Sequence, residues 1–242
     1  MVKASVIIPA LNEEKLIENV LSQFTGEDIK NYNLEIIVSD GGSTDKTLEK
    51  ARKYACNVIE HKTKVRQNIS QGRNNGASIS RGDVLIFFNA DTRISDKKMF
   101  FEKIFEILEN KSMAAIAFPI YVFPEEEKLF DKAFHSFYNN YVIFLNKFFM
   151  GMGRGECHVV RRDLFEKIGG YNEKLFAGED FDLYKRLRKH GKIHFMKDVA
   201  VYESPRRYRR FGYFKVVYDW WKNSIWVTLF HKSSSDEWEA VR

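Results

Sequence analysis

The first 120 residues alternate short β-branched runs with stretches of helical periodicity. Residues 5–8 and 34–38 are apolar runs of strand length; the first ends at Pro9 and the second at a glycine-rich turn. Between them, residues 13–24 place apolar side chains at spacings of three and four, which predicts a helix. Strands that alternate with helices indicate βαβ units. The pattern therefore predicts an α/β fold with a Rossmann-like, mostly parallel sheet flanked by helices.

The same alternation continues toward the middle of the chain. Residues 57–60 predict a third strand, and a helical pattern over 67–79 leads into the apolar run of residues 84–88. That run predicts a central strand with Asn89 and Asp91 at its carboxyl end. Because ligands bind at the carboxyl ends of strands in open parallel sheets, we expect the functional site there.

Two later helices are predicted to have aromatic-rich faces. In residues 128–150, one face carries Phe130, Phe134, Phe137, Tyr141, Phe144 and Phe148, and the opposite face carries Asp131, Lys132, His135, Asn139 and Asn146. Residues 211–242 predict an amphipathic, aromatic-rich C-terminal helix and tail, whose central charges argue against crossing a membrane. Either helix could lie in a membrane interface or pack on protein, and core packing is favoured for residues 128–150.

Composition narrows the class of protein. A chain of 242 residues with 44% hydrophobic residues can bury one sizeable core. The net charge of +6 favours anionic partners, but the basic residues form one short cluster near the C-terminus without an interleaved base-stacking motif or a recognisable module, so nucleic acid is not expected. Cys56 and Cys157 lack metal-ligand spacing, which favours a reducing, cytoplasmic setting. The N-terminus acquires charge too soon for a signal peptide.

Four motifs carry candidate chemistry in a fixed order. They read SVIIPALNE at residues 5–13, VSDGGSTD at 38–45, NAD at 89–91 and GED at 178–180. In order and spacing, this set resembles family 2 glycosyltransferases over roughly residues 4–210. The resemblance implies a GT-A fold, dependence on a divalent metal (Mg²⁺ or Mn²⁺) and inversion of the anomeric centre.

The resemblance places the nucleoside of a sugar donor near the first two motifs. Pro9, Leu11 and Glu13 are expected around the base and ribose, and Asp40 is expected to accept hydrogen bonds from the nucleoside. Simpler alternatives exist for both acids, because Glu13 could favour a helix dipole and Asp40 could only shape a turn.

The donor's diphosphate is expected near the third motif. Asp91 would hold the metal ion against the diphosphate oxygens. The family usually has aspartate at both ends of this triplet, and Asn89 contributes no charge, so weaker metal binding is expected. Arg73 matches the family position that reaches the donor phosphates, although a surface arginine at a polar helix start is the alternative.

The acceptor is expected near the fourth motif. The resemblance makes Asp180 the general base that takes the proton of the acceptor hydroxyl, with Glu179 supporting the site or the acceptor. The alternative is that both acids only begin a helix, where negative charge is favoured.

An arginine-rich segment follows near residue 205. It resembles the segment that closes over phosphates in many family members, and its candidates are Arg206, Arg207 and Arg209. A solvated basic run is the alternative. The target would be the donor diphosphate or a lipid phosphate.

These expectations describe a catalytic domain of residues 1–210, divided near residue 95 into nucleotide-binding and acceptor halves, before the C-terminal helix. The predicted function is transfer of a sugar from a UDP- or GDP-sugar to an acceptor hydroxyl or phosphate. If both aromatic helices bind a bilayer, the acceptor is expected to be polyprenyl-linked, with the protein peripheral at the cytoplasmic face of the membrane.

Two other functions stay open. A sugar-1-phosphate nucleotidyltransferase would share the fold and the metal, but it usually has a glycine-rich basic loop after the first strand, which residues 9–14 lack. A non-catalytic, membrane-associated protein that binds nucleotide sugars is suggested by Asn89 at the metal motif.

Overall fold

A computed structural model describes residues 2–54, 57–63 and 66–234. Within these residues, the main sheet runs in the order β3 (Asn57–Glu60), β2 (Leu34–Asp40), β1 (Ala4–Ala10), β4 (Val84–Phe88), β8 (Cys157–Arg161), β6 (Met113–Ala117) and β9 (Lys192–Phe195). The first four of these strands are mutually parallel, whereas β8 is antiparallel to both its neighbours. The mostly parallel α/β architecture predicted from the sequence is confirmed.

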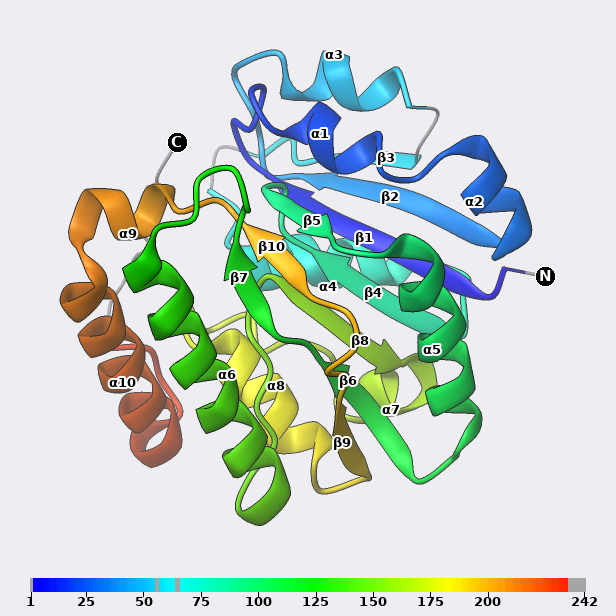
Figure 1. The fold of residues 1–242 in the computed structure, drawn as a ribbon. Helices are drawn as coiled ribbons and strands as arrows, with labels where there is room; N and C mark the ends of the chain where they lie inside the picture. Colours follow the sequence, from blue (N-terminus) through cyan, green and yellow to red (C-terminus); the bar gives the residue numbers. More distant parts are fainter. Residues whose placement is uncertain (1, 55–56, 64–65, 235–242) are drawn as a thin grey trace.

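Helices cover both faces of this sheet (Figure 1). One face carries α1 (Ile17–Leu21), α2 (Gly26–Asn31), α3 (Thr47–Arg52) and α5 (Lys97–Glu109), and the other carries α4 (Ile69–Ile79), α7 (Arg162–Lys167) and α8 (Glu179–Leu187). Successive side chains of a strand point to opposite faces, so Val6 and Ile8 join the first core while Ile7 joins the second. Strands buried on both faces explain the uninterrupted apolar runs in the sequence.

A second, three-stranded sheet brings distant segments together. It has the order β5 (Thr92–Ile94), β10 (Val201–Glu203) and β7 (Ile120–Val122). Strand β5 starts directly after Asp91, and β10 ends shortly before the arginine-rich helix α9 (Arg206–Phe211). The antiparallel pairing of β5 with β10 therefore places Asp91 close to the arginine segment.

The predicted helix of residues 13–24 is shorter than expected. Residues 17–21 are helical, and Asn12 has a positive φ of 53°. The backbone N–H groups of Asn12 and Glu13 donate to the side chains of Ser43 and Thr47, which ties this segment to the neighbouring loop instead of to a helix. The helix predicted over 67–79 begins at Ile69, because Asn68 and Gln71 form a capping box.

The aromatic face of helix α6 (Leu129–Phe148), for which core packing is favoured from the sequence, is only partly packed: Phe134 and Tyr141 join a core cluster, and the other four aromatics are exposed. The buried residues of α6 are Asp131, His135, Tyr138, Asn139, Val142 and Asn146, whereas Phe130, Phe137, Phe144 and Phe148 are exposed. Asn139 exchanges two hydrogen bonds with the backbone of Ile120, and Asn146 does so with Met152. Asn139 and Asn146 are buried because they satisfy backbone groups at the start of β7 (Ile120–Val122) and at Met152.

Helix α10 (Tyr213–Phe230) lies beside α6 (Figure 1). The rings of Tyr138 and Trp220 join the two helices, with centroids 5.3 Å apart. Met1, Cys56 and residues 235–242 of the predicted tail lie outside the described residues, and Cys157 is a buried free thiol. None of the described helices combines the length and apolar character needed to cross a bilayer.

Candidate active site

A cavity of about 410 Å³ lies at the carboxyl ends of β1, β2 and β4. The sequence-predicted site residues that line it are Pro9, Leu11, Glu13, Arg73, Asn89, Asp91, Glu179, Asp180, Arg206 and Arg207. These residues come from segments spread over some 200 positions of the chain. Asp40 and Arg209 are absent from its described lining.

Asp40 ends β2 but turns toward its own loop. Its Oδ2 accepts hydrogen bonds from the N–H groups of Gly42 and Ser43, both at 2.9 Å, as expected of an acid that shapes a turn. Ser39 and Gly41 line the cavity in its place. Oδ1 of Asp40 is buried and has no hydrogen-bond partner among the described residues.

Arg73 is fully buried on α4, so it is not a surface arginine. Its Nη1 donates to Oε1 of Glu179 at 2.8 Å, and its Nη2 donates to Oδ1 of Asn89 at 3.0 Å and to the carbonyl of Gly155 at 2.7 Å. The guanidinium of Arg73 thus connects Glu179 to the Asn89–Asp91 segment. It also engages the amide oxygen of Asn89, which leaves Asp91 as the charged side chain of the NAD segment at this strand end.

Asp91 faces a cation supplied by the chain itself. Nη2 of Arg206 lies 3.1 Å from its Oδ2, and the same guanidinium makes a bidentate contact with Glu13 at 2.7 and 2.9 Å. Burial raises the pKa of Asp91 to about 6, with Arg206 opposing and Glu13 and Glu156 adding to the rise. The carboxylates of Asp91 and Glu13 therefore stabilise the positive charge of Arg206 at this position.

Asp180 and Glu179 begin α8 directly after Gly178, whose φ of 78° lies in the left-handed region that favours glycine. Oδ1 of Asp180 accepts from the N–H of Phe181 at 2.7 Å. Burial and the neighbouring charge of Glu179 raise the pKa of Asp180. A carboxylate with a raised pKa is a stronger base than an exposed one, which suits proton abstraction near neutral pH.

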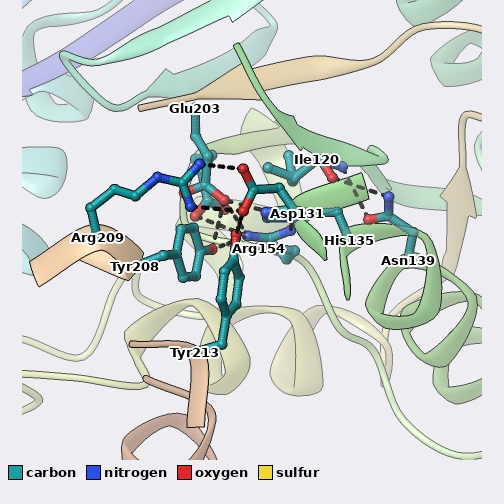
Figure 2. A network of polar contacts seen from close by, with 10 residues as sticks. Ile120, Asp131, His135, Asn139, Arg154, Glu203, Tyr208, Arg209 and Tyr213 are labelled. Carbon is teal, nitrogen blue, oxygen red and sulfur yellow. Dashed lines mark hydrogen bonds and ion pairs between the residues drawn. The ribbon is translucent and has the colours of Figure 1, made fainter. Parts of the chain in front are cut away.

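A buried ionic network, whose contacts are drawn in Figure 2, reaches the cavity through Arg154 and Glu203, which line it. Arg154 donates from Nη2 to Oε1 of Glu203 at 2.6 Å and to the hydroxyl of Tyr208 at 3.1 Å, and its Nη1 lies 3.1 Å from Nδ1 of His135. Arg209 belongs to the outer part of this network, where it pairs with Asp131. The structure therefore brings Arg209 to α6 and not to the cavity.

Many residues of the described cavity lining were not identified from the sequence. They include Tyr138, Arg154, Glu156, Glu203 and Trp220. The charged members had one available signal, because Arg154 and Glu156 lie within the glycine-rich run GMGRGE of residues 151–156, between two apolar segments. A charge in such a run is a candidate for a ligand-facing position, since loops carry function.

A mostly parallel sheet with a polar cavity at the carboxyl ends of its strands defines an α/β protein with a ligand site at the usual position of this fold class. Within that class, the model of the family described as "Glycosyl transferase family 2" matches residues 5–169. The match covers more than half of the chain, so the chain belongs to glycosyl transferase family 2.

Known relatives and solved structures resemble the chain over different lengths. A probable glycosyltransferase, YdaM, from Bacillus subtilis is 26% identical over 84% of the chain and 50% of its own length. A GalNAc(5)-diNAcBac-PP-undecaprenol beta-1,3-glucosyltransferase from Campylobacter jejuni is 33% identical over 39% of the chain and 31% of its own length. The chain thus spans half or less of the length of these two relatives.

The fold also has close structural counterparts. The mannosyltransferase PcManGT from Pyrobaculum calidifontis, solved in complex with GDP-Man and Mn²⁺, superposes with a TM-score of 0.68 at 21% identity, covering 84% of this chain and 56% of that one. The chain accordingly has the GT-A fold predicted from its motifs.

Proposed function

We propose that the chain transfers a sugar from a UDP- or GDP-sugar to an acceptor hydroxyl or phosphate, with inversion at the anomeric carbon. The observation that carries this proposal is the convergence of Asp91, Arg206 and Asp180 in one cavity. Membership of glycosyl transferase family 2 and the GDP-Man complex of a structural neighbour support a nucleotide sugar as donor.

In this proposal, residues 1–95 bind the nucleotide, with Pro9, Leu11 and Glu13 around the nucleoside. Asp40 acts on the nucleoside indirectly, because its hydrogen bonds to Gly42 and Ser43 shape the loop whose Gly41 lines the cavity. Residues 96–210 hold the acceptor, and α10 adds Trp220 and Asn223 to that side of the cavity.

A divalent metal, Mg²⁺ or Mn²⁺, fits the proposed site through Asp91. The described residues contain no group of three His, Cys, Asp or Glu side chains suited to a metal. A single carboxylate suffices, because Mg²⁺ is commonly held by one or two carboxylates together with substrate phosphates. The guanidinium of Arg206 forms ion pairs with Asp91 and Glu13. These pairs support the proposal that the two carboxylates attract a cation. When bound, the metal ion would neutralise charge that develops on the leaving diphosphate.

The chain's own residues perform the remaining steps. Asp180 removes the proton of the acceptor hydroxyl as its oxygen attacks the anomeric carbon, and Glu179 holds Arg73 in place beside it. Arg206 exchanges its carboxylate partners for diphosphate oxygens, and Arg207, which also lines the cavity, contacts the same group. Arg209 stays with Asp131 in a positioning role for α9.

Two outward-facing aromatic stripes support a peripheral membrane contact. On α6 the stripe comprises Phe130, Phe137, Phe144 and Phe148, and on α10 it comprises Phe214, Tyr218, Trp221, Ile225 and Leu229. Both follow helical spacings, so each stripe occupies one side of its helix. Large exposed apolar patches on a protein mark interaction sites. The exposed Lys132, Lys147, Lys215 and Lys222 on the same helices favour anionic lipid headgroups.

The acceptor follows from the position of these stripes. Tyr138 on α6 and Trp220 on α10 line the cavity from the inner sides of the two helices that carry the stripes. A membrane at the outer sides would deliver a lipid-linked acceptor to the cavity's edge, and an undecaprenol-linked acceptor is named for the Campylobacter relative. We therefore propose a polyprenyl-linked acceptor at the cytoplasmic face of a membrane.

Replacement of Asp180 and of Asp91 tests the catalytic proposal. Asp180→Asn is expected to lower the release of nucleoside diphosphate from a nucleotide sugar, with lipid extract as acceptor, by about 10³-fold or more while the donor still binds. Asp91→Ala is expected to remove the Mn²⁺-dependent rise in melting temperature caused by the nucleotide. Asp198→Asn, at an exposed loop position, is the matched control.

The same assay separates the alternatives. Unchanged turnover in Asp180→Asn would remove its role as base. Nucleotide-sugar binding without turnover in the wild type would favour a non-catalytic binding protein, and pyrophosphate-dependent formation of a nucleoside triphosphate would favour a nucleotidyltransferase.

A further inference from the structure

Glu156 is a cavity carboxylate that the proposed mechanism leaves unused. It directly precedes β8, and its carbonyl accepts a hydrogen bond from the N–H of Asn89 at 3.2 Å. The preceding residue, Gly155, adjoins the other end of the site, because a methyl group placed on it would lie 3.6 Å from Oδ2 of Asp180. The chain at residues 155–156 therefore runs between the proposed metal ligand's strand and the proposed base.

The side chain of Glu156 lacks a full set of partners. Only 9% of the residue is exposed, and its Oε2 is buried with no hydrogen-bond partner among the described residues. Glu156 nevertheless lines the cavity. Buried polar atoms are almost always hydrogen-bonded, so an unpartnered carboxylate oxygen in a cavity wall indicates a group that a ligand completes.

Glu203 is a closer ion-pair partner of the buried Arg154 than Glu156 is. Nη2 of Arg154 lies 2.6 Å from Oε1 of Glu203 but 3.5 Å from Oε1 of Glu156. The first distance is that of a strong charge-assisted hydrogen bond, and the second is at the limit of hydrogen bonding. Arg154 therefore holds Glu203 more tightly than Glu156 and reaches Glu156 through Oε1, which leaves Oε2 of Glu156 without a partner among the described residues.

Charge identifies which part of a donor Glu156 can contact. A carboxylate accepts hydrogen bonds and repels phosphate oxygens, so its natural partners here are hydroxyl or amide N–H groups. Its backbone bond to Asn89 and the approach of Gly155 to Asp180 place Glu156 between the two parts of the site. In a transferase of the proposed kind, the sugar ring occupies the space between the leaving diphosphate and the base.

We propose that Glu156 binds hydroxyl groups of the transferred sugar through its unpartnered Oε2, and thereby contributes to the choice of donor sugar. This inference rests on the proposed function, since it needs a nucleotide sugar in the cavity. It assigns Glu156 a part in specificity that is separate from the metal and from proton transfer.

Binding measurements test this role without relying on turnover. Calorimetric titrations with Mn²⁺ would compare UDP with UDP-glucose and UDP-GlcNAc, and GDP with GDP-mannose, on wild type, Glu156→Gln and Glu156→Ala. Glu156→Ala is expected to weaken binding of the accepted nucleotide sugar roughly 10- to 100-fold, as loss of a charged hydrogen bond does, with nucleoside diphosphate affinity within about threefold. Glu102→Gln, on the exposed side of α5, is the matched control.

Deoxy-sugar donors sharpen the test. With the analogue that lacks the contacted hydroxyl, wild type and Glu156→Ala are expected to bind equally, because the interaction is already absent. Equal affinity of wild type and both Glu156 variants for the intact donor would overturn the inference, as would parallel losses for nucleoside diphosphate and nucleotide sugar. If Glu156→Ala does not fold, Glu156→Gln, which keeps the shape, decides the question. Failure of the wild type to bind any nucleotide would instead refute the proposed function, and the inference with it.

Discussion

Helices α5 and α6 are both amphipathic, yet they face the protein in opposite ways. The buried residues of α5 are Phe100, Phe101, Ile104, Phe105 and Leu108, all apolar, and they pack on the sheet. Helix α6 buries Asp131, His135, Asn139 and Asn146 and exposes most of its phenylalanines. One helix follows the usual arrangement of a soluble protein, and the other inverts it.

The difference teaches what a periodic pattern can determine. Spacings of three and four predict a helix with two unlike faces, but they do not say which face meets the protein. On α5 the neighbour is an apolar sheet. On α6 the neighbours are the backbone of Ile120 and Met152 and the buried Arg154, which require polar partners. The apolar face of α6 is left for a second environment, and we propose that this environment is a bilayer.

The same substitution on the two helices gives the largest contrast. Phe100→Ala on α5 is expected to lower the free energy of unfolding by about 3–5 kcal/mol, because Phe100 is fully buried against Phe88 and Phe118 and its removal leaves a cavity. Urea denaturation measures this loss. Phe137→Ala on α6 is the matched control, since 72% of Phe137 is exposed. Equal losses in the two variants would mean that the outward face of α6 is covered in the folded protein.

Much of the fold could be predicted from the sequence. The strands at residues 5–8, 34–38 and 84–88 could be identified because they are buried on both faces, which leaves continuous apolar runs. The strand at residues 57–60 is a partly exposed edge strand. Helix lengths were less predictable, and α1 is short because Ser43 and Thr47, more than 30 positions away, bind the backbone before it. Such long-range contacts have no local signature.

The residues of the candidate site also fall into two groups, those predictable from local sequence and those brought together by long-range contacts. Residues that end strands or begin helices, such as Asp91 and Asp180, were predicted to reach one cavity, and both line it. Arg154, Glu156 and Glu203 were missed because their proximity depends on the pairing of β4 with β8 and of β5 with β10. Arg209 lies three positions after Arg206 but pairs with Asp131 of α6, whereas Arg206 pairs with Asp91, and these partners come from segments far apart in the sequence.

Low pH gives a second contrast between α6 and α5, with an expected change in unfolding free energy of intermediate size. Burial and the charge of Arg154 lower the pKa of His135 on α6 to about 2, whereas α5 buries no ionisable group. Below the ordinary histidine pKa of about 6.5 the unfolded chain binds a proton that the folded chain does not, so folded stability falls as the pH falls. From pH 7.5 to 5.5, His135 is expected to cost about 1.4 kcal/mol of unfolding free energy.

The difference between wild type and His135→Gln isolates this contribution. Glutamine retains a hydrogen-bond acceptor for Arg154, and the raised pKa values of Asp91 and Asp180 affect both proteins alike. Urea unfolding at the two pH values is the measurement. Stability profiles that stay parallel across this range would show that His135 titrates in the folded protein as it does in the unfolded chain.

The smallest change in stability is expected for Phe137→Ala, and this variant tests most directly whether the outward face of α6 binds a membrane. Phe137→Ala should alter the free energy of unfolding by no more than about 0.5 kcal/mol, because its ring already meets solvent. Binding to vesicles with anionic lipid should nevertheless weaken about tenfold, because the bilayer loses most of a phenyl ring's buried area. Vesicle sedimentation measures the partition, and Met99→Ala, at an exposed apolar position on α5, should leave it unchanged. If Phe137→Ala instead abolished a concentration-dependent dimer in solution and left vesicle binding intact, the outward face of α6 would belong to a second copy of the chain.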